Sequence, residues 1–405
     1  MRKLVPLLLL LIGFTIKANA QKRSCGVDAL MEKRMQNPEF KAKYFEREIL
    51  FKENLKSLKT EGKLFRKESV VIPVAIHFPA GSESNRACLE ALSQSQIDIL
   101  NKDFSGTNQD ISLWESAKSH YPGVNTGSVN VRFVIATKNH PSNTDSDLVE
   151  GGKAVTIGYN FGGGQDTDVK WKGYLNVVVK DIEGLGYASL GGLPKIGDAV
   201  VIDNAAFGSG EGCTGFVPGN PYNKGRTLTH ELGHYLNLPH TFSGDCSSDD
   251  GVADTPNIDE SSGGCPAPGS VQMCSNKSLT MNFMDYVNDA CMYMFTAGQA
   301  ERSTAFLSTV KNSYNMTVLS AEVMDMEENL VVYPNPVREN LTIKLGGQFL
   351  KEQVQVQLFD LLGRSVFEFK INENSKISVA NLNTGLYLLK LSTDNNTITK
   401  RIIVE

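Results

Sequence analysis

The chain has 405 residues, a length that suits two or three domains, and its 41% apolar and 21% charged content is that of an ordinary globular protein. Its formal net charge of −5, without a stripe of basic residues among aromatic ones, argues against nucleic acid and other polyanions as partners. Beyond the first twenty residues no apolar run is long enough to span a bilayer, so we expect no integral membrane segment.

The first twenty residues are expected to be a secretory signal peptide. Met1-Arg2-Lys3 is a basic start, Leu4 to Ile16 is an apolar run, and Ala18-Asn19-Ala20 matches a small-x-small cleavage site. The alternative, an uncleaved membrane anchor, needs about 18 or more apolar residues to cross a bilayer. We therefore expect a secreted protein whose cysteines meet an oxidising compartment.

Residues 21–66 have the character of a removable propeptide. Apolar residues recur at helical spacing among charged ones between Val27 and Lys67, which predicts one or two amphipathic helices. The end of this segment, Leu58 to Lys67, is basic and is predicted to be a loop that a protease can cut. We expect the cut to fall within residues 60–67.

From Ser69 to Thr229 the apolar patterns alternate between strand and helix. Predicted strands span Val70 to His77, Val129 to Ala136, Tyr174 to Lys180 and Asp198 to Ile202, and a predicted helix spans Leu89 to Phe104. This alternation predicts an α/β sheet domain, with a helix from Gly225 to Leu236 beneath an open cleft. His77 is expected to be a core or rim histidine.

The eleven residues from His230 to His240 contain three of the six histidines. On a helix, His230 and His234 lie on one face about one turn apart, so both imidazoles can bind one metal ion. His240 would lie nearly three turns along the axis, so the chain must leave the helix and bend back. Asn237 favours a left-handed helix end, and Pro239 cannot continue a helix.

Three histidine ligands leave the fourth position of zinc to water, which is typical of catalytic sites. Glu231 follows the first ligand and is placed to take a proton from that water as a general base. A purely structural zinc site is the alternative, but it would have no use for Glu231. The motif therefore predicts Zn²⁺ as a catalytic cofactor.

The seven cysteines fall into two sets. Four lie in a Gly-, Ser-, Asp- and Pro-rich stretch after the zinc motif and are expected to form bridges: Cys246, Cys265, Cys274 and Cys291. Spacing alone does not choose among their three pairings. Cys25, Cys88 and Cys213 are an odd remainder, so at least one is free or has another role.

Cys25 lies just after the signal cleavage site, in Arg23-Ser24-Cys25-Gly26-Val27. A thiolate is a good zinc ligand, so Cys25 could fill the open fourth position and keep the enzyme silent until the propeptide leaves. From position alone, an unpaired thiol or a disulfide with Cys88 or Cys213 is the better expectation.

An acidic loop follows the zinc motif. Asp249, Asp250, Asp254 and Thr255 offer hard oxygen ligands in a Gly- and Ser-rich setting that suits calcium. The spacing is not that of an EF-hand, and a solvated acidic loop is the alternative.

After about Asn315 the composition changes, with an acidic linker expected over residues 317–329. Residues 330–405 contain short alternating strands separated by Gly and Asn turns, which predict a small C-terminal all-β sandwich. A carbohydrate- or adhesin-type binding module is the alternative, but the segment lacks an aromatic platform.

The zinc motif, followed by Asn282-Phe283-Met284-Asp285-Tyr286, resembles the metzincin clan of zinc endopeptidases. Within the clan, the chain is most similar to the pappalysin family, the group that contains ulilysin and mirolysin. Further matching stretches are Tyr174-Leu175-Asn176-Val177, Gly225 to Thr229, Asp254-Thr255-Pro256 and Asp289 to Gln299. The resemblance runs from Cys25 to about residue 310. It implies a metzincin-type α/β (α+β) catalytic domain at residues 67–316, with a twisted mixed sheet and a zinc-binding active-site helix.

The resemblance also implies roles for single residues. Met284 would be the methionine of the Met-turn beneath the metal, and Tyr286 a mobile tyrosine that helps to stabilise the tetrahedral intermediate. Core packing is the alternative for both. Members of the clan usually have glycine where Asn237 stands, and because asparagine tolerates positive φ we expect the turn to survive.

Two disulfides are implied by the family pattern, Cys246–Cys274 and Cys265–Cys291. The family also identifies the Cys25-Gly26 pair with a cysteine switch, in which Cys25 binds zinc in the zymogen. Related enzymes bind calcium near the acidic loop, which makes Asp250 and Thr255 the first candidates for Ca²⁺ ligands.

Residues 330–405 closely resemble the C-terminal sorting domain of the type IX secretion system of Bacteroidota, which implies that secretion machinery as a partner. Such domains are generally cut off at the outer membrane. The protein is therefore expected to be secreted or attached at the cell surface.

Together these inferences predict a secreted, zymogenic zinc endopeptidase that hydrolyses peptide bonds in proteins through zinc-bound water activated by Glu231. By analogy, Leu185-Gly186-Tyr187-Ala188 belongs to a rim strand that pairs with extended substrate. The family often favours a basic residue after the cut bond, and Asp289 is a candidate acidic partner for it. The alternative is a catalytically inactive secreted adhesion or binding protein that retains the zinc fold, against which the intact Glu231 argues.

Overall fold

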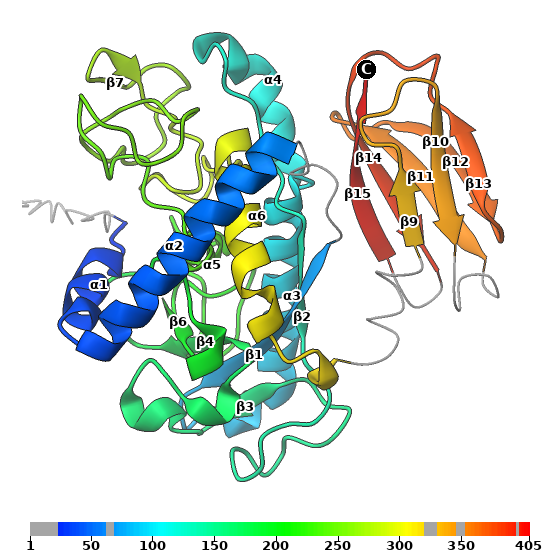
Figure 1. The fold of residues 1–405 in the computed structure, drawn as a ribbon. Helices are drawn as coiled ribbons and strands as arrows, with labels where there is room; N and C mark the ends of the chain where they lie inside the picture. The colour runs from blue at the N-terminus through cyan, green and yellow to red at the C-terminus, as the bar shows by residue number, and fades with distance from the viewer. Residues whose placement is uncertain (1–22, 62–68, 320–329, 346–352, 394–396) are drawn as a thin grey trace, which may run out of the picture.

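The computed structural model describes residues 23–61, 69–319, 330–345, 353–393 and 397–405 (Figure 1). The predicted signal peptide, the basic stretch 62–67 and residues 320–329 of the predicted linker lie outside these described residues. Among the helices that are described, none is long and apolar enough to cross a membrane.

The larger part of the chain is built on a mixed sheet. Its strands are β1 (Val70–Phe78), β2 (Val131–Ile135), β3 (Val155–Ile157), β4 (Leu175–Lys180), β5 (Gly186–Tyr187) and β6 (Ala199–Asp203). The order is β2-β1-β4-β6-β5, with β3 beside β1. Neighbouring strands pair in parallel, except that β5 pairs antiparallel with β6 at one edge. Each predicted strand is confirmed within two residues of its expected ends.

Helices pack around this sheet and share its core. The helices that share this core are α3 (Arg86–Ser105), α5 (Arg226–Tyr235) and α6 (Ala297–Val310). The single-turn α4 (Trp114–Ala117) packs in a separate, smaller apolar cluster. Short 3-10 turns connect the elements: η1 (Glu83–Asn85), η2 (Gln109–Leu113), η3 (Lys118–His120), η4 (Phe161–Gly164), η5 (Val169–Trp171), η6 (Pro194–Ile196), η7 (Lys311–Ser313) and η8 (Met316–Val318). Val318 is fully buried in the main core, so the chain packs with this domain up to η8.

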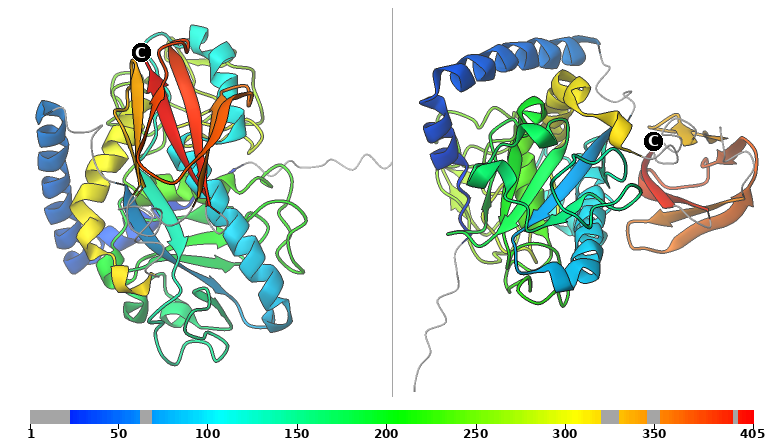
Figure 2. Two further views of the ribbon diagram at one scale, coloured as in Figure 1. Left: turned by 90° about the vertical axis from the view of Figure 1, so that its right-hand side faces the viewer. Right: turned by 90° about the horizontal axis from the view of Figure 1, so that it is seen from below.

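The N-terminal segment forms two helices on the outside of the sheet domain. They are α1 (Val27–Met35) and α2 (Pro38–Glu61), and α2 lies against α6 in all views (Figures 1 and 2). Phe51 of α2 is only 1% exposed and belongs to the main core. Residues 58–61 were predicted as a loop, but they form the end of α2. The prediction was wrong there because the sequence has no glycine or proline between Pro38 and Gly62 to stop the helix.

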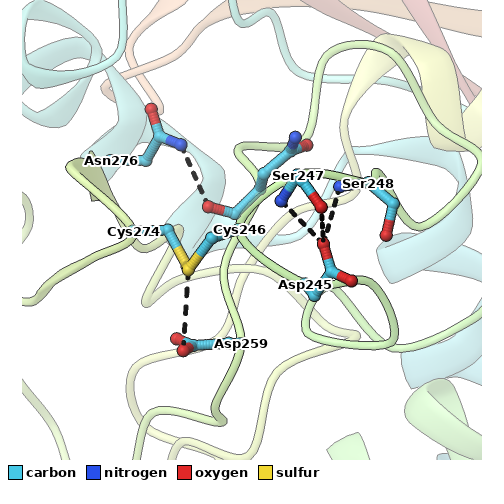
Figure 3. The surroundings of a disulfide bond; sticks show 8 residues. Asp245, Cys246, Ser247, Ser248, Asp259, Cys274 and Asn276 are labelled. Atoms are coloured by element: carbon cyan, nitrogen blue, oxygen red, sulfur yellow. Dashed lines mark hydrogen bonds between the residues drawn. A yellow bond between two sulfur atoms is a disulfide. The ribbon is translucent and has the colours of Figure 1, made fainter.

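Three disulfides are present in the structure, Cys88–Cys213, Cys246–Cys274 and Cys265–Cys291, and Cys25 is a free thiol. The first joins α3 to the loop after β6. The other two lie in the long loop that contains the small hairpin of β7 (Gln272–Met273) and β8 (Asn276–Lys277). Figure 3 shows Cys246–Cys274 beside Asp259, with the neighbouring turn bonded to the Asp245 carboxylate through Ser247 and Ser248. These bridges tie down a stretch that has little core of its own.

The C-terminal part is a separate β-sandwich with its own core (Figure 1). Its strands are β9 (Leu330–Tyr333), β10 (Asn340–Leu345), β11 (Val354–Asp360), β12 (Ser365–Ile371), β13 (Ser375–Ser378), β14 (Gly385–Ser392) and β15 (Thr397–Val404). They form two antiparallel sheets, ordered β13-β10-β9 and β12-β11-β14-β15. The predicted all-β sandwich is thus confirmed.

Candidate active site

Helix α5 is buried along its whole length. Ion pairs and hydrogen bonds to aspartate carboxylates fix its first turn in place. The Arg226 guanidinium lies 3.1 Å from the Asp103 carboxylate and 3.0 Å from that of Asp110. One oxygen of Asp289 accepts hydrogen bonds from the backbone N–H groups of Lys224 and Arg226. A carboxylate at a helix N-terminus is favoured by the helix dipole, so these contacts hold α5 rigidly in the core.

The end of α5 has the bend expected from its sequence. Asn237 adopts a left-handed conformation with φ 72°, and the N–H groups of Asn237 and Leu238 return to the carbonyls of His234 and Gly233. The chain then turns back, so that the Nε2 atoms of His234 and His240 lie 3.0 Å apart. His230, His234 and His240 thereby converge from two sides of the turn.

The histidine rings are oriented by backbone carbonyls. His230 Nδ1 lies 2.6 Å from the Phe283 oxygen, and His234 Nδ1 lies 2.7 Å from the Leu238 oxygen. Such contacts place the proton on Nδ1 and leave the Nε2 lone pair facing the centre. His230 Nε2 is buried and has no hydrogen-bond partner among the described residues. Burial lowers the pKa of His234 to about 4 and the pKa values of the other two as well, which favours neutral, metal-binding imidazoles. This donor set fits zinc.

Glu231 lies beside the histidines, fully buried, with one carboxylate oxygen lacking a partner. Burial raises its pKa to about 8. The close approach of β5 to this side chain requires glycine, because a Cβ at Gly186 would lie 2.9 Å from Glu231 Cγ. The carboxylate therefore faces the edge strand of the sheet.

Met284 and Tyr286 complete the surroundings of the histidines. Met284 is fully buried beneath α5, in contact with Gly233, where a side chain would collide with the thioether. The Tyr286 ring lies 4.9 Å from the His240 ring and 5.8 Å from the His230 ring, between centroids. Burial raises the pKa of Tyr286, so its hydroxyl keeps its proton and can donate a hydrogen bond.

The N-terminal segment enters this site along β5. Leu185 N–H donates to the Ser24 carbonyl at 3.3 Å, and Gly26 N–H donates to the Gly186 carbonyl at 3.0 Å, in parallel pairing. Cys25 Sγ lies 3.3 Å from Glu231 and within the group of atoms formed with the three histidines, all within 4.8 Å of one another. Burial and the nearby Glu231 raise the pKa of the Cys25 thiol.

Two residues before Cys25, the Arg23 side chain is buried and reaches Asp289. Its guanidinium forms a buried 2.5 Å ion pair with the carboxylate oxygen of Asp289 that α5 leaves open. It also donates to the Val287 carbonyl and lies over the Tyr222 ring, 4.8 Å from the centroid. The sequence named Asp289 as an acidic partner, but it gave no sign that Arg23 would reach it.

The three aspartates of the acidic loop have different hydrogen-bond partners. Asp250 Oδ1 accepts hydrogen bonds from the Val252 N–H and the Thr255 hydroxyl, while Asp250 Oδ2 is buried and has no partner in the part of the chain that the structure describes. Burial raises the pKa of Asp250 to about 6. Asp254 instead bonds Thr296 and the Gly298 N–H at the start of α6. Asp249 accepts from the Gly251 N–H on the exposed side.

His77 lies in the core and away from the histidine group. Its Nδ1 is 2.8 Å from the Thr156 hydroxyl and its Nε2 is 3.3 Å from the Asn176 amide oxygen. Phe161 and Trp171 pack against the ring. This is the core position expected from the sequence.

A mixed sheet over a buried helix with converging histidines and a neighbouring carboxylate defines a zinc metalloendopeptidase of the metzincin type. Residues 169–308 match the Peptidase M43 family model, described as pregnancy-associated plasma protein-A. Residues 331–405 match the secretion system C-terminal sorting domain. The chain belongs to this pappalysin-like family, and its tail is a type IX sorting domain that directs secretion.

Relatives and solved structures agree with this assignment. An extracellular metalloprotease of Verticillium alfalfae is 31% identical over 258 residues, which is 60% of this chain and 80% of the relative. Extracellular metalloprotease 1 of Coccidioides posadasii is 29% identical over 319 residues, 75% of this chain and 97% of the relative.

Mature mirolysin of Tannerella forsythia, in complex with a cleaved peptide, matches with TM-score 0.50 and 30% identity over 62% of this chain and 97% of that chain. A promirolysin mutant from the same organism matches with TM-score 0.52 and 29% identity, covering 72% of this chain and 95% of that chain. The second match therefore extends over more of this chain than the first.

Proposed function

We propose that this enzyme is made as a latent zinc endopeptidase, with Glu231 as general base and residues 21–66 as a removable inhibitory propeptide. The observation that carries the proposal is the position of Cys25. Its sulfur lies 3.3 Å from Glu231 and among the histidine nitrogens, where an attacking water has to enter. The similarity to a promirolysin structure supports the same idea. The remaining proposed divisions are a catalytic domain at 67–316, against which η8 (Met316–Val318) still packs, a linker over the rest of 317–329, and the sorting domain at 330–405.

His230, His234 and His240 would hold zinc through their Nε2 atoms. When bound, zinc supplies a Lewis acid that lowers the pKa of water and polarises a carbonyl. The Phe283 and Leu238 carbonyls orient two of the rings for this role.

Two side chains take part in the reaction, one as a proton acceptor and one as a hydrogen-bond donor. Glu231 accepts a proton on its carboxylate from the attacking water and passes it to the leaving amine. Tyr286, which keeps its proton, donates a hydrogen bond to the oxyanion that develops at the scissile carbonyl. Met284 supports the histidines from below and takes no part in proton transfer.

Replacing Glu231 with glutamine tests the general base. The variant keeps the shape of the side chain, so we expect normal zinc content but a loss of about 10² to 10⁴-fold in turnover. Peptidase activity and zinc are measured on the same activated sample, with casein as substrate and a chelator as control. Turnover within a few fold of wild type would remove Glu231 from the mechanism. Absence of any chelator-sensitive cleavage by the wild-type enzyme would instead favour an inactive binding protein.

Latency is tested at Cys25. Burial raises the pKa of the Cys25 thiol and so disfavours the thiolate. A zinc ion held by the histidines would favour the thiolate as its ligand. The Cys25→Ala precursor should cleave peptides before its propeptide is cut and should mature faster. Ser24→Ala is the matched control, because Ser24 contacts β5 through its backbone. Mature N-termini should begin beside Lys63, Arg66 or Lys67, which lie outside the described residues. Equal latency of both precursors would assign inhibition to other contacts.

Specificity for a basic residue after the cut bond is proposed to come from Asp289. The buried ion pair between the Arg23 guanidinium and Asp289 supports this proposal. In the activated enzyme, Asp289→Asn should lower kcat/KM for peptides with arginine at that position by about 10-fold or more, because a charged hydrogen bond is weakened. Cleavage profiles of a peptide library by mass spectrometry measure the change. An unchanged preference for arginine after the cut bond would show that Asp289 does not determine specificity.

Calcium is proposed to bind at the acidic loop through Asp250 and Thr255. The supporting observation is the buried, unpartnered Oδ2 of Asp250. Calcium should raise the melting temperature of the wild type but not that of Asp250→Asn. Asp249→Asn, on the exposed side of the loop, is the control. An equal calcium effect on all three would place the ion elsewhere.

A further inference from the structure

The N-terminal segment carries a second arginine into the sheet domain, at Arg34 in the last turn of α1. Its Nη1 lies 2.8 Å from Asp198 Oδ1 and donates to the Ser189 hydroxyl at 2.5 Å. The Asp198 side chain is 0% exposed and that of Arg34 is 12% exposed. The guanidinium therefore covers a buried carboxylate.

Asp198 is only half satisfied by its own domain. Its Oδ2 accepts a hydrogen bond of 3.2 Å from the Leu193 N–H. Its Oδ1 is buried and accepts no hydrogen bond from the described residues, so the ion pair with Arg34 is its direct charge partner. A buried carboxylate that loses its partner is strongly unfavourable. Removal of the propeptide therefore leaves this oxygen in need of another cation.

Asp198 and Ser189 lie at one end of the strand that borders the active site. Ser189 follows β5 by two residues, and Asp198 directly precedes β6. The propeptide runs along β5 from Ser24, beside Leu185, to Gly26, beside Gly186. Arg23 and Arg34 thus pair with buried aspartates at opposite ends of this strand, and Cys25 lies between them at the histidines.

We propose that Asp198 and Ser189 form a second specificity pocket, which binds an arginine or lysine side chain of the substrate on the amino-terminal side of the cut bond. This rests on the proposed function, in which the residue after the cut bond enters the Asp289 pocket. The residue after the cut bond then occupies the end of β5 near Leu185 and Asp289. The substrate residues before the cut bond extend in the other direction, past Tyr187 towards Ser189. The substrate then runs opposite to the propeptide, which explains why the propeptide fills both pockets without presenting a bond for cleavage at the histidines.

The first test uses the wild-type enzyme, activated from the full-length precursor. A set of peptides has arginine fixed after the cut bond and a second arginine moved through the positions before it. Each peptide is paired with one that has citrulline, which keeps the shape and removes the charge, at the moved position. At one position before the cut, arginine should exceed citrulline in kcat/KM by about 10-fold or more. Ratios below about twofold at every position would overturn the proposal.

The second test asks whether Asp198 is responsible. Asp198→Asn can still accept the Leu193 hydrogen bond, and it should reduce the arginine-to-citrulline ratio to within about twofold. Asp166→Asn is the matched control. Asp166 is also an aspartate beside β5, but its carboxylate accepts hydrogen bonds from Lys180 and from the Tyr187 hydroxyl. It should retain the full ratio. Retention of the ratio in Asp198→Asn would also overturn the proposal. If that variant does not fold, as judged by zinc content and melting, the wild-type scan decides. Failure of the proposed function would show itself differently, as absence of chelator-sensitive cleavage of every peptide.

Discussion

Phe51 of α2 offers a direct measure of how firmly the propeptide is docked. Its side chain is 1% exposed, with its ring 6.2 Å from that of Phe306 on α6 and the Arg302 guanidinium 5.0 Å above it. Truncating a buried phenylalanine to alanine typically costs about 3 to 5 kcal/mol. Since about 1.4 kcal/mol corresponds to a factor of ten, even the lower figure shifts the docked-to-undocked ratio of the propeptide by more than about 100-fold.

The assay compares Phe51→Ala with Phe45→Ala, which changes a residue on the same helix that is 51% exposed. Surface changes of this kind usually alter stability by about 0.5 kcal/mol or less. The Phe51→Ala precursor should show peptidase activity before cleavage, and added trypsin should degrade its propeptide faster.

After maturation the two enzymes should have the same melting temperature and kcat, because the altered helix has been removed. A Phe51→Ala precursor as latent and as resistant to trypsin as Phe45→Ala would refute the idea that α2 anchors the propeptide.

Three further outcomes are expected. Replacing Cys88 and Cys213 with serine should lower the free energy of unfolding by up to about 4 to 5 kcal/mol, since the bridge spans 125 residues; an unchanged urea midpoint would contradict this. Gly233→Ala should cost about 1 to 3 kcal/mol, seen as a lower melting temperature, because the new Cβ collides with Met284. A chain ending at residue 325 should fold and cleave peptides in vitro but accumulate in the periplasm of a type IX host, and normal export would disprove the sorting role of the tail.

Local sequence determined much of the active-site helix and its surroundings. The spacing of His230 and His234 follows from the helical repeat, and the left-handed Asn237 ends the helix at the residue expected. The strands were predictable because a sheet covered on both faces demands continuous apolar runs. Local signals failed at residues 58–61, where a basic composition suggested a loop and the helix continued.

Long-range contacts decided what no local pattern encodes. Cys88 pairs with Cys213 across 125 residues, and the sequence left that pairing open. Arg23 forms an ion pair with Asp289, 266 residues away in the chain. The sequence around Arg23 does not distinguish it from an arginine exposed at the surface.

The physical reason is that helix period and turn chemistry act between neighbours in the chain, so the sequence alone determined the zinc motif, the bend after it and the strands. Partners for a buried charge or thiol depend on which surfaces the fold brings together. The family resemblance already assigned Cys25 to the zinc site, whereas only the tertiary structure paired Arg23 with Asp289 and Arg34 with Asp198 at the two ends of β5.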